Sequence, residues 1–116
     1  MILADTSVWV AHLKRPGGDA ELVAALEAGV LTSHPFVEGE LLLAGAPVGA
    51  LLAGVEWLVV SPHEEVRSFV ASLDAPLRGV GWVDVHLLHA ALANQQRLLT
   101  RDRALAGHFA RLARVR

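Results

Sequence analysis

The chain has 116 residues and a formal net charge of −2, and 53% of its residues are hydrophobic. This length suits one domain with a single packed core, and so apolar a composition excludes an intrinsically disordered chain. The slightly acidic charge argues against a simple electrostatic clamp on nucleic acid, and the lack of cysteine excludes disulfides and thiolate metal sites.

Short apolar runs alternate with longer helical patterns along the chain, which is typical of a parallel sheet covered by helices. We therefore expect an α/β fold formed by one domain over residues 1–116. In chain order the predicted elements are a strand over residues 1–4, a short helix carrying residues 9–13, a helix over 19–28, a strand over 30–33, a helix over 35–44, a strand over 57–60, a helix over 61–73, a helix over 82–94, a strand over 97–100, a helix over 102–110 and a short fifth strand near 113–115.

Several residues mark where these helices begin and end. Asp19 is a good N-cap, and Gly29 is typical of a helix end because glycine readily adopts the left-handed conformation. Pro35 suits the first turn of a helix, where its missing N–H group costs no hydrogen bond. Ser61 and Glu64 have the spacing of a capping box, which predicts the start of a further helix.

Neither a targeting segment nor a membrane span is expected. The first ten residues, MILADTSVWV, contain an acid and no basic residue, unlike a signal peptide. The longest uncharged stretch, residues 41–55, is interrupted by glycine and proline and falls short of the ~20 apolar residues of a membrane helix. We therefore expect a soluble, cytoplasmic protein.

Four acids occupy unusual places in this layout. Asp5 directly follows the first predicted strand, and Asp102 follows the fourth. In open parallel sheets the ligand crevice lies outside the carboxyl ends of the strands. Asp84 falls in the first turn of its helix, after a Gly-Val-Gly loop, and Glu40 lies in an otherwise apolar helix, where a buried carboxylate without a partner is costly. These four residues are the candidates for a functional site.

Each of these acids also has a purely structural interpretation. Asp102 can be an ordinary N-cap, Asp5 a turn residue, and Asp84 a charge that complements the helix dipole. Glu38 lies two residues before Glu40, and that spacing places the two side chains on roughly opposite faces of a helix. Only one of the two should therefore point at the crevice.

Carboxylates that converge at a strand-end crevice repel one another unless a cation lies between them. Ligands that are all oxygen favour Mg²⁺ or Mn²⁺ over Zn²⁺. Such an ion can activate a water molecule and offset charge on a phosphate oxygen, so the expected chemistry is hydrolysis of a phosphodiester. A bound metal would also let a net-acidic protein act on RNA.

Four segments, in this order along the chain, resemble motifs of the VapC-type toxins of the PIN-domain family: DTSVW, HPFVEGELLLAG, GVGWVDVHLL and LLTRDRAL. The resemblance spans Met1 to about His108. It implies a three-layer α/β/α sandwich with a central, mostly parallel sheet of four to five strands, usually as a homodimer. It also implies a Mg²⁺- or Mn²⁺-dependent endoribonuclease with a VapB-like antitoxin as its partner.

The resemblance assigns roles to particular residues of this chain. Asp5, Glu40 and Asp84 match the likeliest direct metal ligands, and Asp102 matches an acid that binds metal more loosely, through water or at a second site. The small hydroxyl positions that support this catalytic cluster fall on Thr6, Ser7 and Thr100. Two departures are a short stretch between residues 44 and 56 and the extra acid Glu38, both of which bear on the contacts around the third helix, including any antitoxin groove there.

The C-terminal segment from residue 97 to 116 contains six arginines and one acid. Because Arg97, Arg101 and Arg103 are close to Asp102 in sequence, we hypothesise that they contact the RNA backbone. The structural alternative is a solvated, arginine-rich terminal helix.

His86 and His89 have an i, i+3 spacing that can bind metal, but no third nitrogen or sulfur ligand is visible, so packing or hydrogen bonding is expected instead of a zinc site. The three tryptophans are expected in the core or at an interface. Trp82, beside Asp84, is the one that could contact the substrate or a dimer partner.

These observations predict a toxin that cleaves structured RNA, such as tRNA or rRNA, with a metal-activated water. One alternative is a nuclease that acts on DNA or on a particular nucleic-acid structure with the same acids. The other is a non-catalytic PIN-like binding module in which the acids are only caps. The presence of all four acids favours the enzyme, because a degenerate copy would be free to lose some of them.

Overall fold

A computed structural model describes residues 1–115 of the chain and is built on a four-stranded sheet in the order β3-β2-β1-β4. The strands are β1 (Ile2–Ala4), β2 (Leu31–Ser33), β3 (Glu56–Trp57) and β4 (Arg97–Leu99). All three pairings are parallel, and β1 lies between β2 and β4. The predicted α/β class and parallel sheet are confirmed.

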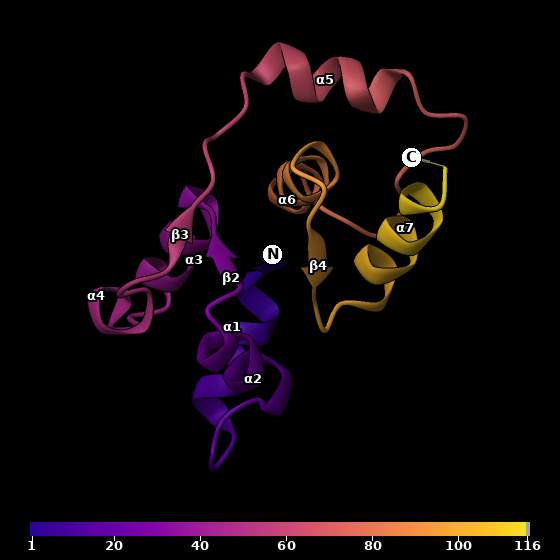
Figure 1. The fold of residues 1–116 in the computed structure, drawn as a ribbon. Helices are drawn as coiled ribbons and strands as arrows, with labels where there is room; N and C mark the ends of the chain where they lie inside the picture. Colours follow the sequence, from indigo (N-terminus) through magenta and orange to yellow (C-terminus); the bar gives the residue numbers. More distant parts are fainter. Residues whose placement is uncertain (116) are drawn as a thin grey trace.

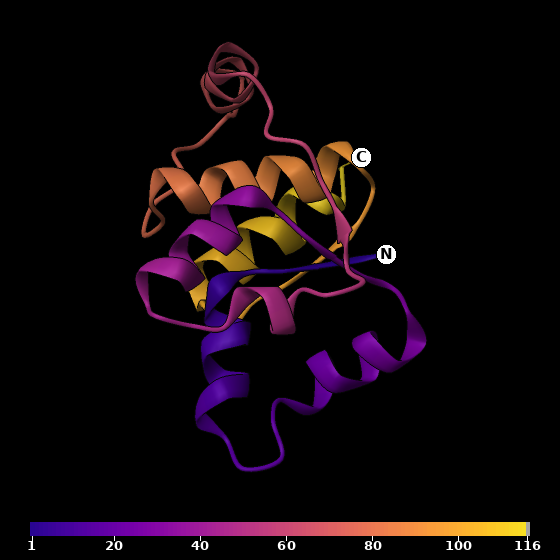
Figure 2. The same cartoon turned by 90° about the vertical axis from the view of Figure 1, so that its left-hand side faces the viewer.

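Helices cover both faces of this sheet. They are α1 (Thr6–Lys14), α2 (Ala20–Ala28), α3 (Pro35–Leu43), α4 (Val48–Leu51), α5 (His63–Ala71), α6 (Trp82–Ala93) and α7 (Arg103–Ala113). Figures 1 and 2 show α6 over one face of the sheet and α1 and α2 beneath the other, which is the arrangement of a three-layer α/β/α sandwich. Within residues 1–115, no helix combines the length and the apolar character needed to cross a membrane.

Capping residues bound α2 and α7 where their sequence signals predict. The side chain of Asp19 accepts hydrogen bonds from the backbone N–H groups of Glu21 and Leu22 at the start of α2. Gly29 ends that helix in the left-handed conformation, with φ of 69°. Asp102 caps α7 by accepting from the backbone N–H of Leu105 at 3.0 Å.

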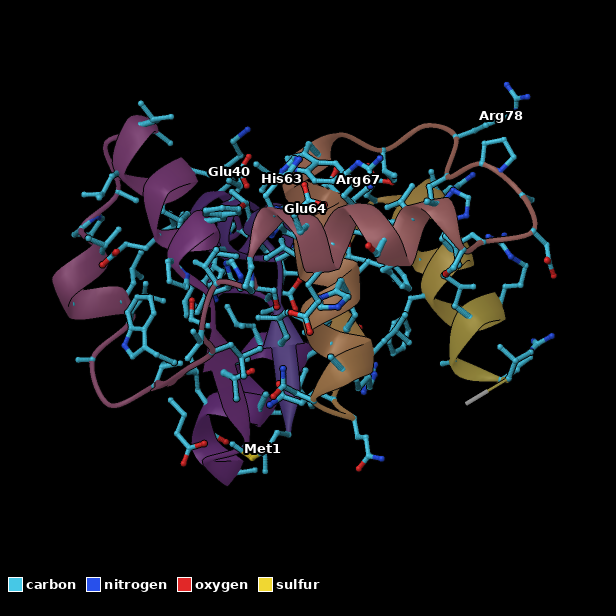
Figure 3. All side chains as sticks on the ribbon, turned by 90° about the horizontal axis from the view of Figure 1, so that it is seen from above. Met1, Glu40, His63, Glu64, Arg67 and Arg78 are labelled. Carbon is cyan, nitrogen blue, oxygen red and sulfur yellow. The ribbon has the colours of Figure 1, made fainter. Side chains whose placement is uncertain are left out.

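The core is built around α6, whose residues Val85–Leu92 are all buried. A helix that is covered on all sides needs no polar face, and this one packs on β1 and β4 below, on α7 at its side and on α5 above. Figure 3 shows α5 crossing over α6. Phe69 of α5 meets His89 of α6 edge-on, with ring centroids 5.3 Å apart, and Val66 of α5 is fully buried. The N-terminus of α6 is therefore held firmly against the carboxyl ends of the strands.

Three sequence predictions were wrong. The third strand is Glu56–Trp57, and not 57–60, because β2 ends at Ser33: the Leu58 N–H still donates to the Ser33 carbonyl at 2.8 Å, and the chain then leads away toward α5. The capping box at Ser61 and Glu64 does not form, since extended Pro62 is the N-cap and no side chain caps α5. No strand forms at 113–115, because α7 continues to Ala113 on apolar residues that pack against the core, Leu105, Phe109 and Leu112. The short helix α4 was not predicted.

Candidate active site

The carboxyl ends of β1 and β4 lie side by side, and they carry the first and last of the four candidate acids. The backbone N–H of Asp5 donates to the carbonyl of Leu99 at 3.0 Å, so the chain leaves both strands at the same level of the sheet. Asp5 is then the N-cap of α1, and Asp102 is the N-cap of α7. Neighbouring parallel strands thus bring together two acids that are almost a hundred residues apart in sequence.

The carboxylate of Asp5 is only 3% exposed but accepts three hydrogen bonds. Its Oδ1 accepts from the Ser7 hydroxyl at 2.6 Å and from the backbone N–H of Val8 at 3.2 Å. Its Oδ2 accepts from the Thr100 hydroxyl at 2.5 Å. These donors offset the cost of burying a charge, so Asp5 is held in one orientation.

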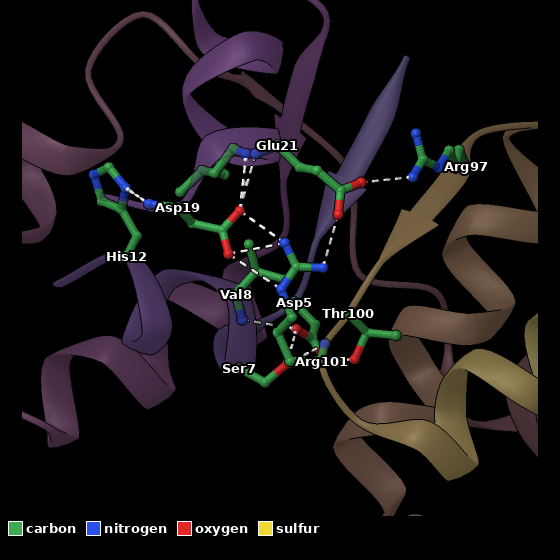
Figure 4. A network of polar contacts seen from close by, with 10 residues as sticks. Asp5, Ser7, Val8, His12, Asp19, Glu21, Arg97, Thr100 and Arg101 are labelled. Atoms are coloured by element: carbon green, nitrogen blue, oxygen red, sulfur yellow. Dashed lines mark hydrogen bonds and ion pairs between the residues drawn. The ribbon is translucent and has the colours of Figure 1, made fainter. Parts of the chain in front are cut away.

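The same two hydroxyls tie the loop after β4 to the start of α1 (Figure 4). A hydroxyl has one hydrogen to donate, and Ser7 and Thr100 both give theirs to Asp5. Their lone pairs accept in turn from the backbone N–H groups of Arg101 at 2.9 Å and Asp102 at 3.0 Å. The supporting roles expected for Ser7 and Thr100 therefore have a geometric basis.

Glu40 reaches the site from α3 and is held by the third expected hydroxyl. The Thr6 side chain donates to Oε1 of Glu40 at 2.6 Å, which joins α3 to the first turn of α1. Glu38 makes no side-chain hydrogen bond or ion pair with any residue that the structure describes. Of the two neighbouring glutamates, Glu40 is therefore the one that faces the strand ends.

Asp84 completes the group from the first turn of α6. Burial raises the pKa of this half-buried carboxyl, and the negative charges of Asp5, Glu40 and Asp102 raise the pKa further, against the opposing effect of a hydrogen bond from the Gly81 N–H at 3.4 Å. Since all three other acids act on Asp84, the four carboxylates share one electrostatic environment. The structure thus brings together all four acids that the sequence singled out.

The donor set consists of carboxylate and hydroxyl oxygens, which suits a hard divalent cation. Within the described chain, no three His, Asp or Glu side chains form a ready-made metal cage. Mg²⁺ does not need such a cage, because it keeps several waters and commonly takes only one or two carboxylates directly. The residues therefore fit Mg²⁺ better than a metal that requires a closed, four-ligand site.

The arginines near the site are engaged with acids of α2 (Figure 4). The Arg101 guanidinium donates to both carboxylate oxygens of the fully buried Asp19, at 2.7 and 2.8 Å, and to Glu21 at 3.0 Å. The hydrogen bond from Arg101 lowers the pKa of Asp19. Arg97 pairs with Glu21 at 2.9 Å, whereas Arg103 is exposed and has no acidic partner within residues 1–115. A phosphate would have to compete with these acids for Arg97 and Arg101.

Sequence reasoning missed two features beside the site. The bidentate pair of Arg101 with Asp19 was not foreseen, because capping fully accounted for Asp19. His34 was also missed: its Nδ1 accepts from the Phe36 N–H at 3.0 Å and caps α3. Burial, and secondarily the charge of His86, lower the pKa of His34 to about 4. The only sequence signal for this capping role was the position of His34, immediately before Pro35, which starts the helix.

The two histidines of α6 pack as the sequence analysis expected. His86 lies against Phe36, with ring centroids 4.8 Å apart, and His89 lies against Phe69. Burial is the main reason that the pKa of His86 is lowered. Both side chains are thus part of the packing between helices.

Comparison with known proteins agrees with this architecture. No protein-family model matches the chain. It is similar to two proteins named Ribonuclease VapC32, from the CDC 1551 / Oshkosh and H37Rv strains of Mycobacterium tuberculosis. It is 41% identical to each over 110 residues, which covers 90% of this chain and 87% of the relative. The chain belongs to the VapC-type toxins, which are PIN-domain ribonucleases.

Proposed function

We propose that this protein is a Mg²⁺- or Mn²⁺-dependent endoribonuclease that cleaves structured RNA, such as tRNA or rRNA, as the toxin of a VapBC-like pair. The observation that carries the proposal is the convergence of four carboxylates, from Asp5, Glu40, Asp84 and Asp102, at the ends of two neighbouring strands. A group of this kind, in a relative of a named ribonuclease, supports metal-assisted phosphodiester hydrolysis.

In this proposal Asp5, Glu40 and Asp84 hold the cation directly, and Asp102 binds more loosely from the start of α7. When bound, the cation supplies positive charge beside the scissile phosphate and the acidity needed to activate a water molecule. Without such a charge, the four carboxylates would repel the RNA backbone.

The hydroxyls serve the reaction by orienting these acids. Ser7 and Thr100 donate to the two oxygens of Asp5, and Thr6 donates to one oxygen of Glu40. Partners of this type around metal-binding carboxylates fix the direction of the remaining lone pairs. The site is therefore built to accept a cation and a phosphate with little rearrangement of β1 or β4.

The direct test is cleavage of purified tRNA and rRNA, and of single-stranded DNA, with Mg²⁺ or Mn²⁺ and with EDTA. We expect metal-dependent cuts at discrete positions in RNA that disappear in Asp5→Asn. Glu38→Gln is the matched control, because Glu38 lies on the same helix as Glu40 and makes no side-chain hydrogen bond or ion pair within residues 1–115.

Three results would contradict the proposal. Equal cleavage of DNA would favour the nuclease that acts on DNA or on a particular nucleic-acid structure. Cleavage that persists in EDTA or in Asp5→Asn would remove the metal-binding role of the site. A folded protein that cuts nothing under any metal would favour the non-catalytic binding module.

As a VapC-type toxin, the protein is expected to bind a VapB-like antitoxin and to form a homodimer. The end of α3 displays two neighbouring exposed leucines, Leu42 and Leu43, the latter 91% exposed. Apolar side chains grouped in this way are typical of an interaction surface. Light scattering of the purified protein, alone and with the co-expressed antitoxin, tests both partners.

A further inference from the structure

Trp82, at the N-terminus of α6, is the aromatic side chain that stands closest in sequence to the acidic site. We propose that its indole, supported by His63, is a stacking platform for one unpaired base of the RNA substrate. This inference rests on the ribonuclease function proposed above. It adds that substrates are recognised by an unpaired base beside the cleaved bond.

Exposure is the first observation. Trp82 is 43% exposed, whereas Trp9 is fully buried in the core. Trp57 is equally exposed, at 45%, so exposure alone does not define a binding site. Trp57 lies on the edge strand β3 and makes no aromatic contact within the described chain, which makes it a matched control.

Support by neighbouring rings distinguishes Trp82. The ring of His63 at the start of α5 lies 5.4 Å from the indole, measured between centroids, and the ring of His86 meets it edge-on at 5.3 Å. His86 is itself buried and packed against Phe36. An aromatic ring that is already held in place loses little conformational freedom when a base stacks on it.

Two ring contacts link Trp82 to α3, the helix that carries Glu40. Phe36 and Glu40 are one helical turn apart on α3 and so share a face. Phe36 packs on His86, and His86 packs on Trp82. Asp84 lies in the same first turn of α6 as Trp82 but about 200° around the helix. The N-terminus of α6 thus directs the Asp84 carboxylate toward the ends of the strands and the Trp82 indole toward the flank of the molecule where α5 begins.

The flank beside Trp82 carries charges of both signs, from Arg67 and from Glu64 and Glu65 of α5. Arg67 is one turn after His63 on α5 and is paired only loosely with Glu64, at 3.8 Å between two well-exposed side chains. Seen from above, His63, Glu64 and Arg67 lie along α5, with Glu40 to one side of them and Arg78 on the loop that follows α5 (Figure 3). A part-exposed aromatic ring that is held in place on a polar edge is suited to a base turned onto it, since every base has a face that can stack.

Binding, and not cleavage, gives the cleanest test. The affinity of end-labelled bulk tRNA is measured by fluorescence anisotropy with Ca²⁺ in place of Mg²⁺, and a gel verifies that the RNA stays intact. We expect Trp82→Ala to weaken binding about tenfold, Trp82→Phe to restore most of it and Trp57→Ala to leave it unchanged. The slope of affinity against salt should not change, because stacking involves no phosphate contact.

A fully paired RNA duplex serves as the control ligand, because it offers no unpaired base. Its bases are stacked internally, so Trp82→Ala should leave its weaker binding unchanged. Equal affinity of Trp82→Ala and wild type for tRNA, or an equal loss in Trp57→Ala, would overturn the stacking role. Cleavage by wild type that is absent in Asp5→Asn would then still stand, so the two proposals fail separately.

A second measurement does not depend on how Trp82→Ala folds. In a Trp57→Phe protein, the remaining tryptophans are the buried Trp9 and the exposed Trp82. Stacking of a base should quench the exposed component and reduce its accessibility to acrylamide when tRNA is added. Emission and accessibility that stay constant at saturating tRNA would contradict the proposal.

Discussion

The acidic site has two halves that are held in different ways. Asp5 and Asp102, which follow β1 and β4, form the strand half, and Glu40 and Asp84, on α3 and α6, form the helix half. In the strand half, Asp5 accepts three hydrogen bonds, and the hydroxyls that donate two of them also bind the loop that carries Asp102. In the helix half, Glu40 accepts one hydroxyl and Asp84 accepts one long bond, at 3.4 Å. The strand half is therefore held by more hydrogen bonds than the helix half, which leaves Glu40 and Asp84 freer to adjust to a ligand.

This difference has an energetic reason. Hydrogen bonds to a charged group contribute about 1.5–3 kcal/mol each, so three donors hold the buried Asp5 side chain firmly in place. Asp84 has fewer donors and three acidic neighbours, and its pKa is raised, first by burial and then by those charges. The fold thus surrounds Asp5 with hydrogen-bond donors, whereas it works against the charge of Asp84.

The largest expected loss of stability follows from removing the ion pair between Arg101 and Asp19, which lies behind the strand half. Arg101→Ala would leave the buried Asp19 without its bidentate partner and loosen the loop between Thr100 and Asp102. Removing one partner of a fully buried pair costs about 3–5 kcal/mol, and because Arg101 is one-third exposed we expect about 2–3 kcal/mol. Urea unfolding measures this loss.

If Arg101 instead served mainly to bind RNA phosphates, Arg101→Ala would keep its stability and lose affinity. The matched variant is Arg103→Ala, whose side chain is exposed and has no acidic partner within residues 1–115. For Arg103→Ala we expect unchanged stability and a smaller salt dependence of RNA binding.

Removing one supporting hydroxyl from each half compares directly how firmly the two halves are held. Thr100→Val removes a donor from the buried Asp5 and should cost about 1–3 kcal/mol of stability, because a charged acceptor is left short of a partner. Thr6→Val removes the corresponding donor from Glu40, which is more exposed, and should cost less than 1 kcal/mol. Both should lower cleavage about 10–100-fold, as losses of supporting partners do.

Thermal unfolding and single-turnover cleavage on the same protein samples test this pair of variants. Equal losses of stability in Thr100→Val and Thr6→Val would contradict the distinction between a firmly held strand half and a freer helix half.

The smallest effect concerns Asp84. An acid whose pKa is raised by folding gives its full stability below the unfolded pKa, and that stability is lost as pH rises through the folded pKa. Asp84→Asn should therefore stabilise the protein at neutral pH while it abolishes cleavage. Because solvent screens a half-buried group, the gain should be about 0.5 kcal/mol. Unfolding at pH 3 and pH 7 should show a gain only at pH 7.

Much of this site could be predicted because its signals are local. A turn after a strand marks Asp5, an N-cap marks Asp102, and the opposite faces of one helix separate Glu40 from Glu38. The pairing of Arg101 with Asp19 could not be predicted, since it joins residues 82 apart in sequence and each had a sufficient local explanation. Residues 58–60 were assigned to a strand on composition, but β2, the strand beside β3, ends at Ser33, so the ladder cannot continue along them.

The central claim, that these carboxylates form a divalent cation site, is tested most directly by isothermal titration with Mn²⁺. We expect one saturable uptake by wild type and by Glu38→Gln that is absent in Asp5→Asn. An Asp5→Asn protein that is folded and takes up Mn²⁺ as wild type does would contradict the account.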